Sequence, residues 1–281
     1  MVVDKILYKA WENYKKNFAT FIGGLVLSVI IPTLIVTIPA VIMFLPLMHV
    51  LFSSGFSAAI KYFMAHIEIF LIDIFVLLLL SLIVFPPFSF GFIHLVKKGR
   101  KRKAKVQFLF EGVKIYWKKA ILQQVLSFAI FMVITAMVAF PAFFHLKSVI
   151  PHVYAPKVEK NSVMPYDTVE YSHSPGFALF VFLTYFSIWF LLILVVSFFL
   201  LYWRYEIVNF DCGVIEGLKR SISKVRHNLF ETFVVCLIIA LISAVAVLVE
   251  KVIPIIPTLL ISPLLTSILV EASAQLKEKS M

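Results

Sequence analysis

The chain has 281 residues, of which 62% are hydrophobic and only 15% are charged, and its mean hydropathy is +1.00. Because a soluble domain carries about 45–50% apolar and about 25% charged residues, this composition excludes a water-soluble fold and predicts an all-α integral membrane protein. The net charge of +11 matters mainly through its distribution along the chain.

Six apolar stretches are long enough to cross a bilayer core of about 30 Å, which takes about 20 helical residues. We predict spans at 19–45, 74–96, 120–146, 174–203, 232–249 and 252–270. The first lies in a charge-free stretch, 17–60, which is too long for one straight span. Three prolines predict bends or an exit there, followed by an interfacial or re-entrant segment at 46–64; they are Pro32, Pro39 and Pro46.

Lys and Arg divide unevenly between the segments that connect these spans. One alternating set holds 21 of the 26 Lys and Arg residues and consists of 1–18, 97–119, 204–231 and 271–281. Cytoplasmic loops carry an excess of Lys and Arg. The alternation therefore predicts a protein of the cell membrane with both termini in the cytoplasm.

The densest basic run, KKGRKRKAK, occupies 97–105 and includes Lys97, Lys98, Arg100, Lys101, Arg102, Lys103 and Lys105. Its place at the end of the second span favours a topological anchor that also contacts anionic lipid headgroups. Lys219 and Arg220 are assigned the same role. Nucleic acid is not an expected partner, because no stacking platform or nucleic-acid-binding fold accompanies the run.

A basic amphipathic stretch precedes each odd-numbered span, at 6–21, 108–123 and 216–233. In the first stretch, an apolar stripe recurs at helical spacing and consists of Leu7, Trp11, Tyr14 and Phe18. Apolar stripes with basic backs are typical of helices that lie in the membrane interface. Four aromatic side chains are the expected interfacial anchors: Trp11, Tyr14, Tyr116 and Trp117.

The three stretches also predict an internal repeat, with units at 1–100, 101–205 and 206–281. Aligning Asn17, Lys119 and Asn228 brings three small residues into coincidence: Ala10, Gly112 and Ser221. Each unit would be one interfacial helix followed by a transmembrane hairpin. The alternative is that basic flanks before any three spans look alike.

The segments 87–117 and 205–233 resemble prokaryotic six-helix membrane-domain families, including the membrane domain fused to some glycerophosphoryl diester phosphodiesterases. The residues that carry this resemblance are Gly91, Phe110, Gly112, Gly217, Leu218, Lys219, Arg220 and Ser221. The resemblance implies a six-helix membrane domain. It implies no phosphodiesterase activity, which in those proteins belongs to a separate soluble barrel.

Polar groups of the predicted outer side are the best indication of chemistry. Asp73 stands within apolar sequence, with His66 and Glu68 just before it, and an ionisable residue inside a span is a candidate for function. The alternative places Asp73 near the interface, hydrated or bonded to a neighbouring helix. A peripheral metal site could be assembled with further histidines, His49, His145, His152 and His173, but their spacing shows no ligand motif. We expect neither a metal nor a cofactor.

These features favour a non-enzymatic, lipid-interacting or membrane-organising protein with anionic lipids as partners. The alternative is a transporter or lipid-translocating protein with a cavity between the hairpins, and a membrane enzyme ranks third. The loop at 147–175 is either a lid, a partner surface or a solvated connection.

Overall fold

The computed structural model describes residues 2–153, 175–251 and 253–276, and of these the side chains of 146–153 and 175–178 are left undescribed. Throughout this part of the chain every regular element is an α-helix. Six helices are long and apolar enough to cross a membrane, which confirms the predicted all-helical class and the number of candidate spans. In five of the six, at most 17% of the most apolar 18 residues are buried in the protein, so most of their apolar surface faces outward, as in helices that contact lipid.

The described helices fall into two compact units. Met1–Val125 and Phe199–Met281 form the first unit, and Leu126–Phe198 forms the second. The helices are α1 (Val2–Ser54), α2 (Phe56–Ala65), α3 (Ile67–Lys101), α4 (Gln107–Val153), α5 (Pro175–Phe199), α6 (Trp203–Phe210), α7 (Val214–His227), α8 (Leu229–Glu250) and α9 (Ile256–Gln275).

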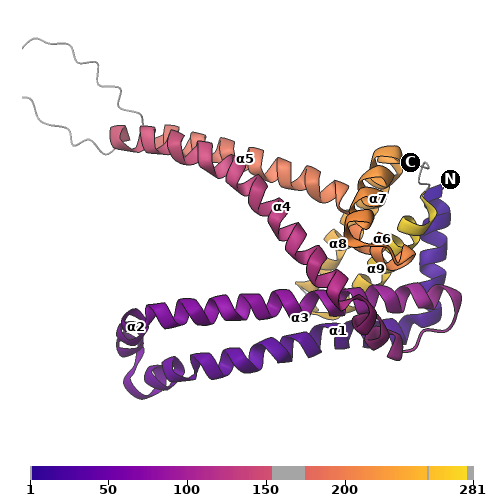
Figure 1. Ribbon diagram of the computed structural model, residues 1–281, viewed down its shortest axis with the longest axis horizontal. Coiled ribbons are helices and arrows are strands. Elements are labelled where there is room, and N and C mark those ends of the chain that lie inside the picture. The colour runs from indigo at the N-terminus through magenta and orange to yellow at the C-terminus, as the bar shows by residue number, and fades with distance from the viewer. Residues whose placement is uncertain (1, 154–174, 252, 277–281) are drawn as a thin grey trace, which may run out of the picture. The chain divides into compact units, whose positions relative to one another are not determined.

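Helix α1 bends at Asn17, where the backbone leaves helical geometry at φ −118° and ψ 17°. Figure 1 shows the indigo segment before the bend running in a different direction from the rest of α1. Beyond the bend, α1 continues through all three of its prolines as far as Ser54. Proline is tolerated in membrane helices because neighbouring groups and local adjustments satisfy the freed carbonyls.

The chain reverses direction at Gly55, which has φ +83°, a conformation that glycine adopts without a side-chain clash. The segment expected to be interfacial or re-entrant, 46–64, is therefore the end of α1 followed by the short helix α2. Helix α3 then runs back along α1. At 35 residues it is about 52 Å long, so its basic end extends beyond a bilayer core.

The three basic amphipathic stretches take three different forms. The first is the opening segment of α1, joined to the span through the bend at Asn17. The second is the start of α4 and continues into the span within one helix. The third is mainly a separate helix, α7, which ends at His227 and is divided from α8 by Asn228.

The core of the first unit lies at the basic ends of its helices. Trp203, Phe21, Phe90 and Leu95 are completely buried there or nearly so. Figure 1 shows the start of α1, the end of α3, α6, α7 and α9 gathered at this end, with α2 at the opposite end. The hairpin of α1 and α3 beyond this core carries mostly exposed apolar side chains.

The second unit contains the later part of α4 and the described part of α5. The indole of Trp189 donates a hydrogen bond to the Thr135 hydroxyl at 3.1 Å. His145 Nδ1 lies 3.3 Å from the hydroxyl of Tyr185. These two contacts tie the helices together in an otherwise apolar pair. The expected outer loop falls largely in 154–174, outside the described residues.

Candidate functional site

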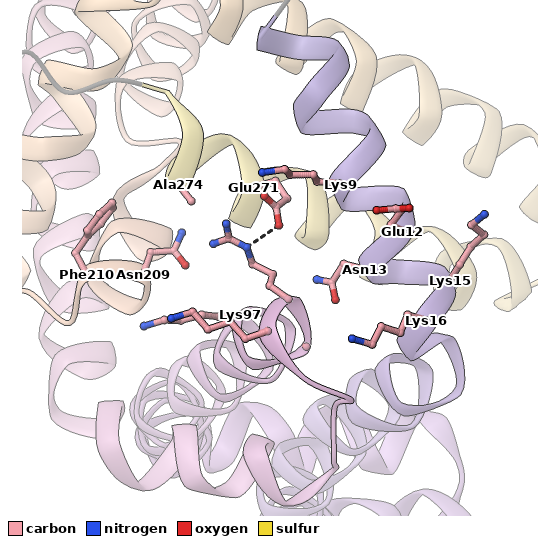
Figure 2. Close-up of a pocket in the computed structure, with 13 residues that line it drawn as sticks. Lys9, Glu12, Asn13, Lys15, Lys16, Lys97, Asn209, Phe210, Glu271 and Ala274 are labelled. Carbon is pink, nitrogen blue, oxygen red and sulfur yellow. Dashed lines mark ion pairs between the residues drawn. The ribbon is translucent and has the colours of Figure 1, made fainter.

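A cavity of about 830 Å³ opens at the basic end of the first unit, and we name it the basic pocket. Figure 2 shows its lining side chains arriving from the first segment of α1, the end of α3, the end of α6 and α9. Six cationic and two acidic side chains line it: Lys9, Lys15, Lys16, Lys97, Arg100 and Lys101, with Glu12 and Glu271. The pocket therefore carries an excess of four positive charges and is suited to an anion.

The two acids of the basic pocket already have partners. Arg100 Nε lies 2.6 Å from Glu271 Oε1, and Gln275 donates to the other oxygen of Glu271 at 2.9 Å. The Tyr8 hydroxyl donates to Glu12 at 2.7 Å. Two carboxylates, one of them paired with Arg100, offset only part of the positive charge of the lining.

The remaining cations differ in how free they are to meet a ligand. Lys97 Nζ donates to the Val208 carbonyl at 2.6 Å. In Figure 2 the amines of Lys9 and Lys16 face the space that Lys97 also borders, whereas Lys15 points away from it. Lys15 instead lies 5.7 Å from the ring centre of Trp11.

The structure divides the basic run 97–105 into residues with different surroundings. Lys97, Arg100 and Lys101 line the pocket. The others lie outside its lining. Lys98 lies 3.9 Å from Glu111, and the Arg102 guanidinium lies 4.2 Å from the ring centre of Phe108. The last two cations of the run, Lys103 and Lys105, are exposed.

Two buried asparagines hold α1 against this end of α3. Asn13 Nδ2 donates to the Val96 carbonyl at 3.3 Å. Asn17 donates to the Gly99 carbonyl at 3.2 Å and accepts the backbone N–H of Ala104 at 2.7 Å. Since Gly99 and Ala104 enclose residues 100–103, these bonds hold the four cations of that segment in position.

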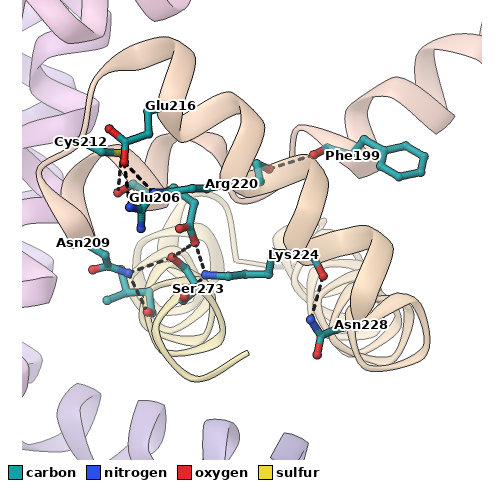
Figure 3. Close-up of polar contacts among 11 residues, drawn as sticks. Phe199, Glu206, Asn209, Cys212, Glu216, Arg220, Lys224, Asn228 and Ser273 are labelled. Atoms are coloured by element: carbon teal, nitrogen blue, oxygen red, sulfur yellow. Dashed lines mark hydrogen bonds and ion pairs between the residues drawn. The ribbon is translucent and has the colours of Figure 1, made fainter. Parts of the chain in front are cut away.

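A buried polar cluster, drawn in Figure 3, includes Asn209, which also lines the basic pocket. Lys224 Nζ lies 2.5 Å from Glu206 Oε1 and also donates to the Ser273 carbonyl. The Ser273 hydroxyl donates to the same carboxylate oxygen at 2.8 Å and accepts from Asn209 at 3.0 Å. Glu206 and Lys224 are 0% and 1% exposed, so the cluster joins α6, α7 and α9 in a dry interior.

A second cavity of about 660 Å³ lies at the depth of the apolar segments, and we name it the hydroxyl groove. Its polar lining consists of Ser28, Ser81, Ser89, Gln124, Arg204 and Thr266, among apolar side chains of α1 and α3. Ser28 follows Lys16 by 12 residues, or about 18 Å along a helix. This distance is comparable with half the thickness of a bilayer core of about 30 Å.

Lys219 and Arg220 lie on α7, outside both cavities. Lys219 is exposed, and Arg220 pairs with Glu216 at 2.7 Å on the same helix. The structure thus does not bring these two cations to the cations of the basic run.

The expected aromatic anchors divide into two classes. Trp11 and Trp117 are 47% and 48% exposed, as interfacial side chains would be. Tyr14 and Tyr116 differ from the expectation because they are buried. Their hydroxyls lie 2.8 Å from the Leu260 carbonyl and 3.4 Å from the Val208 carbonyl.

The candidate outer site, His66, Glu68 and Asp73, lies at the α2 end of the first unit, and no ion pair joins these three described residues. His66 Nδ1 lies 2.9 Å from the Tyr62 carbonyl and its ring stacks on that of Tyr62. Within the described residues, no group of three or more His, Cys, Asp or Glu residues could hold a metal ion. His152 and His173 lie among the residues whose side chains are undescribed.

Comparison with known proteins places most of this architecture in one family. A family model described as a domain of unknown function, DUF7847, matches residues 113–279, which is more than half of the chain. The chain belongs to the DUF7847 family. No curated protein and no solved structure matches it.

The DUF7847 match covers only one wall of the basic pocket. Asn209 and Glu271 lie inside the matched residues, whereas Lys9, Lys16 and Lys101 precede them. Of these five residues, the sequence pattern predicted only Lys101 as a site residue. It did not predict Lys9, Lys16, Asn209 or Glu271. One signal was present for Glu271, which is the sole acid within the apolar helix α9.

Proposed function

We propose that this DUF7847 protein is a non-enzymatic membrane protein that binds phosphate-bearing, anionic lipid headgroups in the basic pocket. The observation that carries the proposal is that cationic side chains of α1 and α3, distant in sequence, line one cavity. Basic pockets between membrane helices are typical sites for anionic headgroups. Lysine and arginine donate strong, charge-assisted hydrogen bonds to phosphate.

The proposal includes an orientation in which the basic pocket faces the cytoplasm. The positive-inside distribution supports it, since 21 of the 26 Lys and Arg residues belong to one alternating set of segments. In the first unit, α2 lies at the opposite end from the basic segments (Figure 1), and Lys61 belongs to α2. The proposed lipid thus belongs to the cytoplasmic leaflet, which carries the negative surface potential.

We also propose that the three amphipathic stretches descend from one repeated unit. Asn17 and Asn228 support this, because each donates its side-chain amide to the carbonyl four residues before it and interrupts the helix there. The aligned small residues Ala10, Gly112 and Ser221 are all buried. The second copy departs from this pattern of interrupted helices, because α4 continues through Lys119 as one helix.

Charge removal from the pocket tests the proposed function. A triple variant should bind a short-chain phosphatidylglycerol at least about tenfold more weakly; it combines Lys9→Gln, Lys16→Gln and Lys101→Gln. The reason is that each cation contributes up to about 1 kcal/mol to the binding free energy. Binding is measured by thermophoresis of purified protein in neutral detergent, at low and high salt. Inorganic phosphate, added as a competitor, distinguishes a headgroup site from a site for free phosphate.

The matched control removes the same charge outside the pocket, through Lys5→Gln, Lys103→Gln and Lys105→Gln. All three lysines are exposed and none lines the cavity. The control should bind nearly as the original protein does. Equal losses in both triple variants would show a diffuse charge effect and would contradict a defined headgroup site, as would unchanged binding in the pocket variant.

A lipid-translocating protein is the second candidate, and the polar side chains that line the hydroxyl groove among apolar segments support it. Translocation needs such groups along the path of a headgroup. Reconstituted liposomes with a fluorescent lipid report it directly, through the fraction of label that an impermeant reductant reaches. A rate no faster than in protein-free liposomes would exclude this candidate and leave the binding proposal intact.

A further inference from the structure

The hydroxyl groove has its charged group at one end and apolar side chains at the other. Arg204 Nη1 donates to the Ser89 hydroxyl at 3.4 Å, and Ser89 precedes Lys97 by eight residues on α3. From Ser89 the lining continues along α3 through Phe85 to Ser81, which lies about 12 Å farther from the basic end. This order matches that of a lipid, with its headgroup toward the interface and its chain toward the midplane.

The charge of the groove is unbalanced. Arg204 is an exposed side chain directly after an apolar stretch, and no carboxylate belongs to the lining. Its guanidinium offers five donors in a planar fork that matches phosphate, and the Ser89 bond occupies one of them. An anionic occupant would meet this unbalanced charge.

The deeper part of the groove suits an acyl chain although it contains hydroxyl groups. Ser28, Ser81 and Thr266 donate their hydrogens to carbonyls of their own helices, at 2.8, 2.8 and 3.0 Å. Since these donors are already bonded, they leave little unmet polarity beside an apolar chain. The walls between them consist of apolar side chains: Leu25, Val29, Leu82, Phe85, Phe92 and Ile93.

We propose that the hydroxyl groove is a second lipid site, which takes one anionic phospholipid with its phosphate on Arg204 and Ser89 and an acyl chain along α1 and α3. The cavity of about 660 Å³ falls within the range of about 300–1,000 Å³ that ligand sites occupy. The site is separate from the basic pocket, with which it shares no lining residue. It therefore does not rest on the proposed headgroup function.

Photo-crosslinking tests this site in nanodiscs of phosphatidylcholine. A phosphatidylglycerol with a diazirine in its acyl chain is irradiated with the protein, and mass spectrometry locates the labelled residues. The proposal expects labelling concentrated at Val29, Leu82 and Phe85. Arg204→Gln should lower it by about tenfold, since a charge-assisted hydrogen bond is lost, whereas Arg204→Lys should retain part of it.

Three comparisons make the result decisive. Arg226→Gln removes an exposed arginine of α7 that lines neither cavity and should leave the labelling unchanged. The Lys9, Lys16 and Lys101 triple variant should also leave it unchanged, which separates this site from the basic pocket. Three results would overturn the proposal. The first is equal labelling with a phosphatidylcholine probe, and the second is labelling that persists in Arg204→Gln. The third is labelling that occurs only with a fatty-acid probe.

Discussion

At the scale of single residues, the buried ion pair of Glu206 and Lys224 links three helices in the core at the basic end. The two side chains come from α6 and α7, and the Ser273 carbonyl on α9 completes the coordination of the ammonium group. Two charges removed from water are tolerated only when each has close partners. The pair therefore requires all three helices to be in place at once.

Removal of one partner should be costly. Lys224→Met leaves the Glu206 carboxylate buried without its counter-ion, and we expect a loss of about 3–5 kcal/mol in the free energy of unfolding. Thermal or denaturant unfolding in detergent measures this loss. The exposed pair of Arg220 and Glu216 supplies the control, and Arg220→Gln should cost at most about 1 kcal/mol. Similar losses in the two variants would contradict a critical role for the buried pair.

At the scale of elements, the crossing of α3 and α4 depends on two glycines in contact. A Cβ on Gly112 would lie 2.7 Å from the Cβ of His94 and 2.8 Å from the Cα of Gly91. A Cβ on Gly91 would lie 2.6 Å from the Leu109 carbonyl oxygen. Small residues permit such close backbone approach between membrane helices. The approach also brings the start of α4 against the basic end of α3.

A single methyl group should disturb this crossing. Gly112→Ala forces displacement of backbone atoms, and we expect a destabilisation of about 1–3 kcal/mol by thermal unfolding. Gly23→Ala is the matched control within α1, because a Cβ there meets nothing within 4 Å. That control should leave stability unchanged or raise it by up to about 1 kcal/mol. If Gly112→Ala unfolds at the same temperature as the control, the crossing is looser than the geometry implies.

For the whole molecule, the orientation in the membrane is the property with the widest consequences. It decides whether the basic pocket meets the negatively charged cytoplasmic leaflet. Impermeant maleimide applied to intact cells should label Lys61→Cys and Lys251→Cys, but reach Lys5→Cys and Lys105→Cys only after permeabilisation. Labelling of Lys105→Cys in intact cells would contradict the proposed orientation.

The two native cysteines could also react with maleimide in that experiment. Cys212 donates to the Glu206 carbonyl at 3.6 Å, and burial raises the pKa of its thiol above the ordinary value. Little of the reactive thiolate is then present at neutral pH. The variants are nevertheless made with Cys212→Ser and Cys236→Ser, and this cysteine-free protein should take up no label before or after permeabilisation.

Composition and apolar run length were sufficient to predict the membrane class and the six candidate spans. Hydrophobic periodicity was a less reliable guide to which residues of each amphipathic stretch are buried. The apolar stripe of the first stretch was expected to lie in the membrane interface; Trp11 and Phe18 are 47% and 41% exposed, whereas Tyr14 is buried. The pattern did not indicate that Asn13 and Asn17 are buried. Their amides bond to carbonyls of α3, so a polar residue can face the core in a way that hydrophobic periodicity does not register.

The sequence by itself determined that this protein needs lipid as its solvent, because no soluble fold can bury so large an apolar fraction. It also singled out the basic run 97–105. Only the tertiary structure decided that Arg100 and Lys101 join Lys9 and Lys16 at one cavity, while Lys103 and Lys105 remain outside it. The reason is that a charge pattern is local in sequence, whereas a pocket forms where the ends of helices distant in sequence pack together.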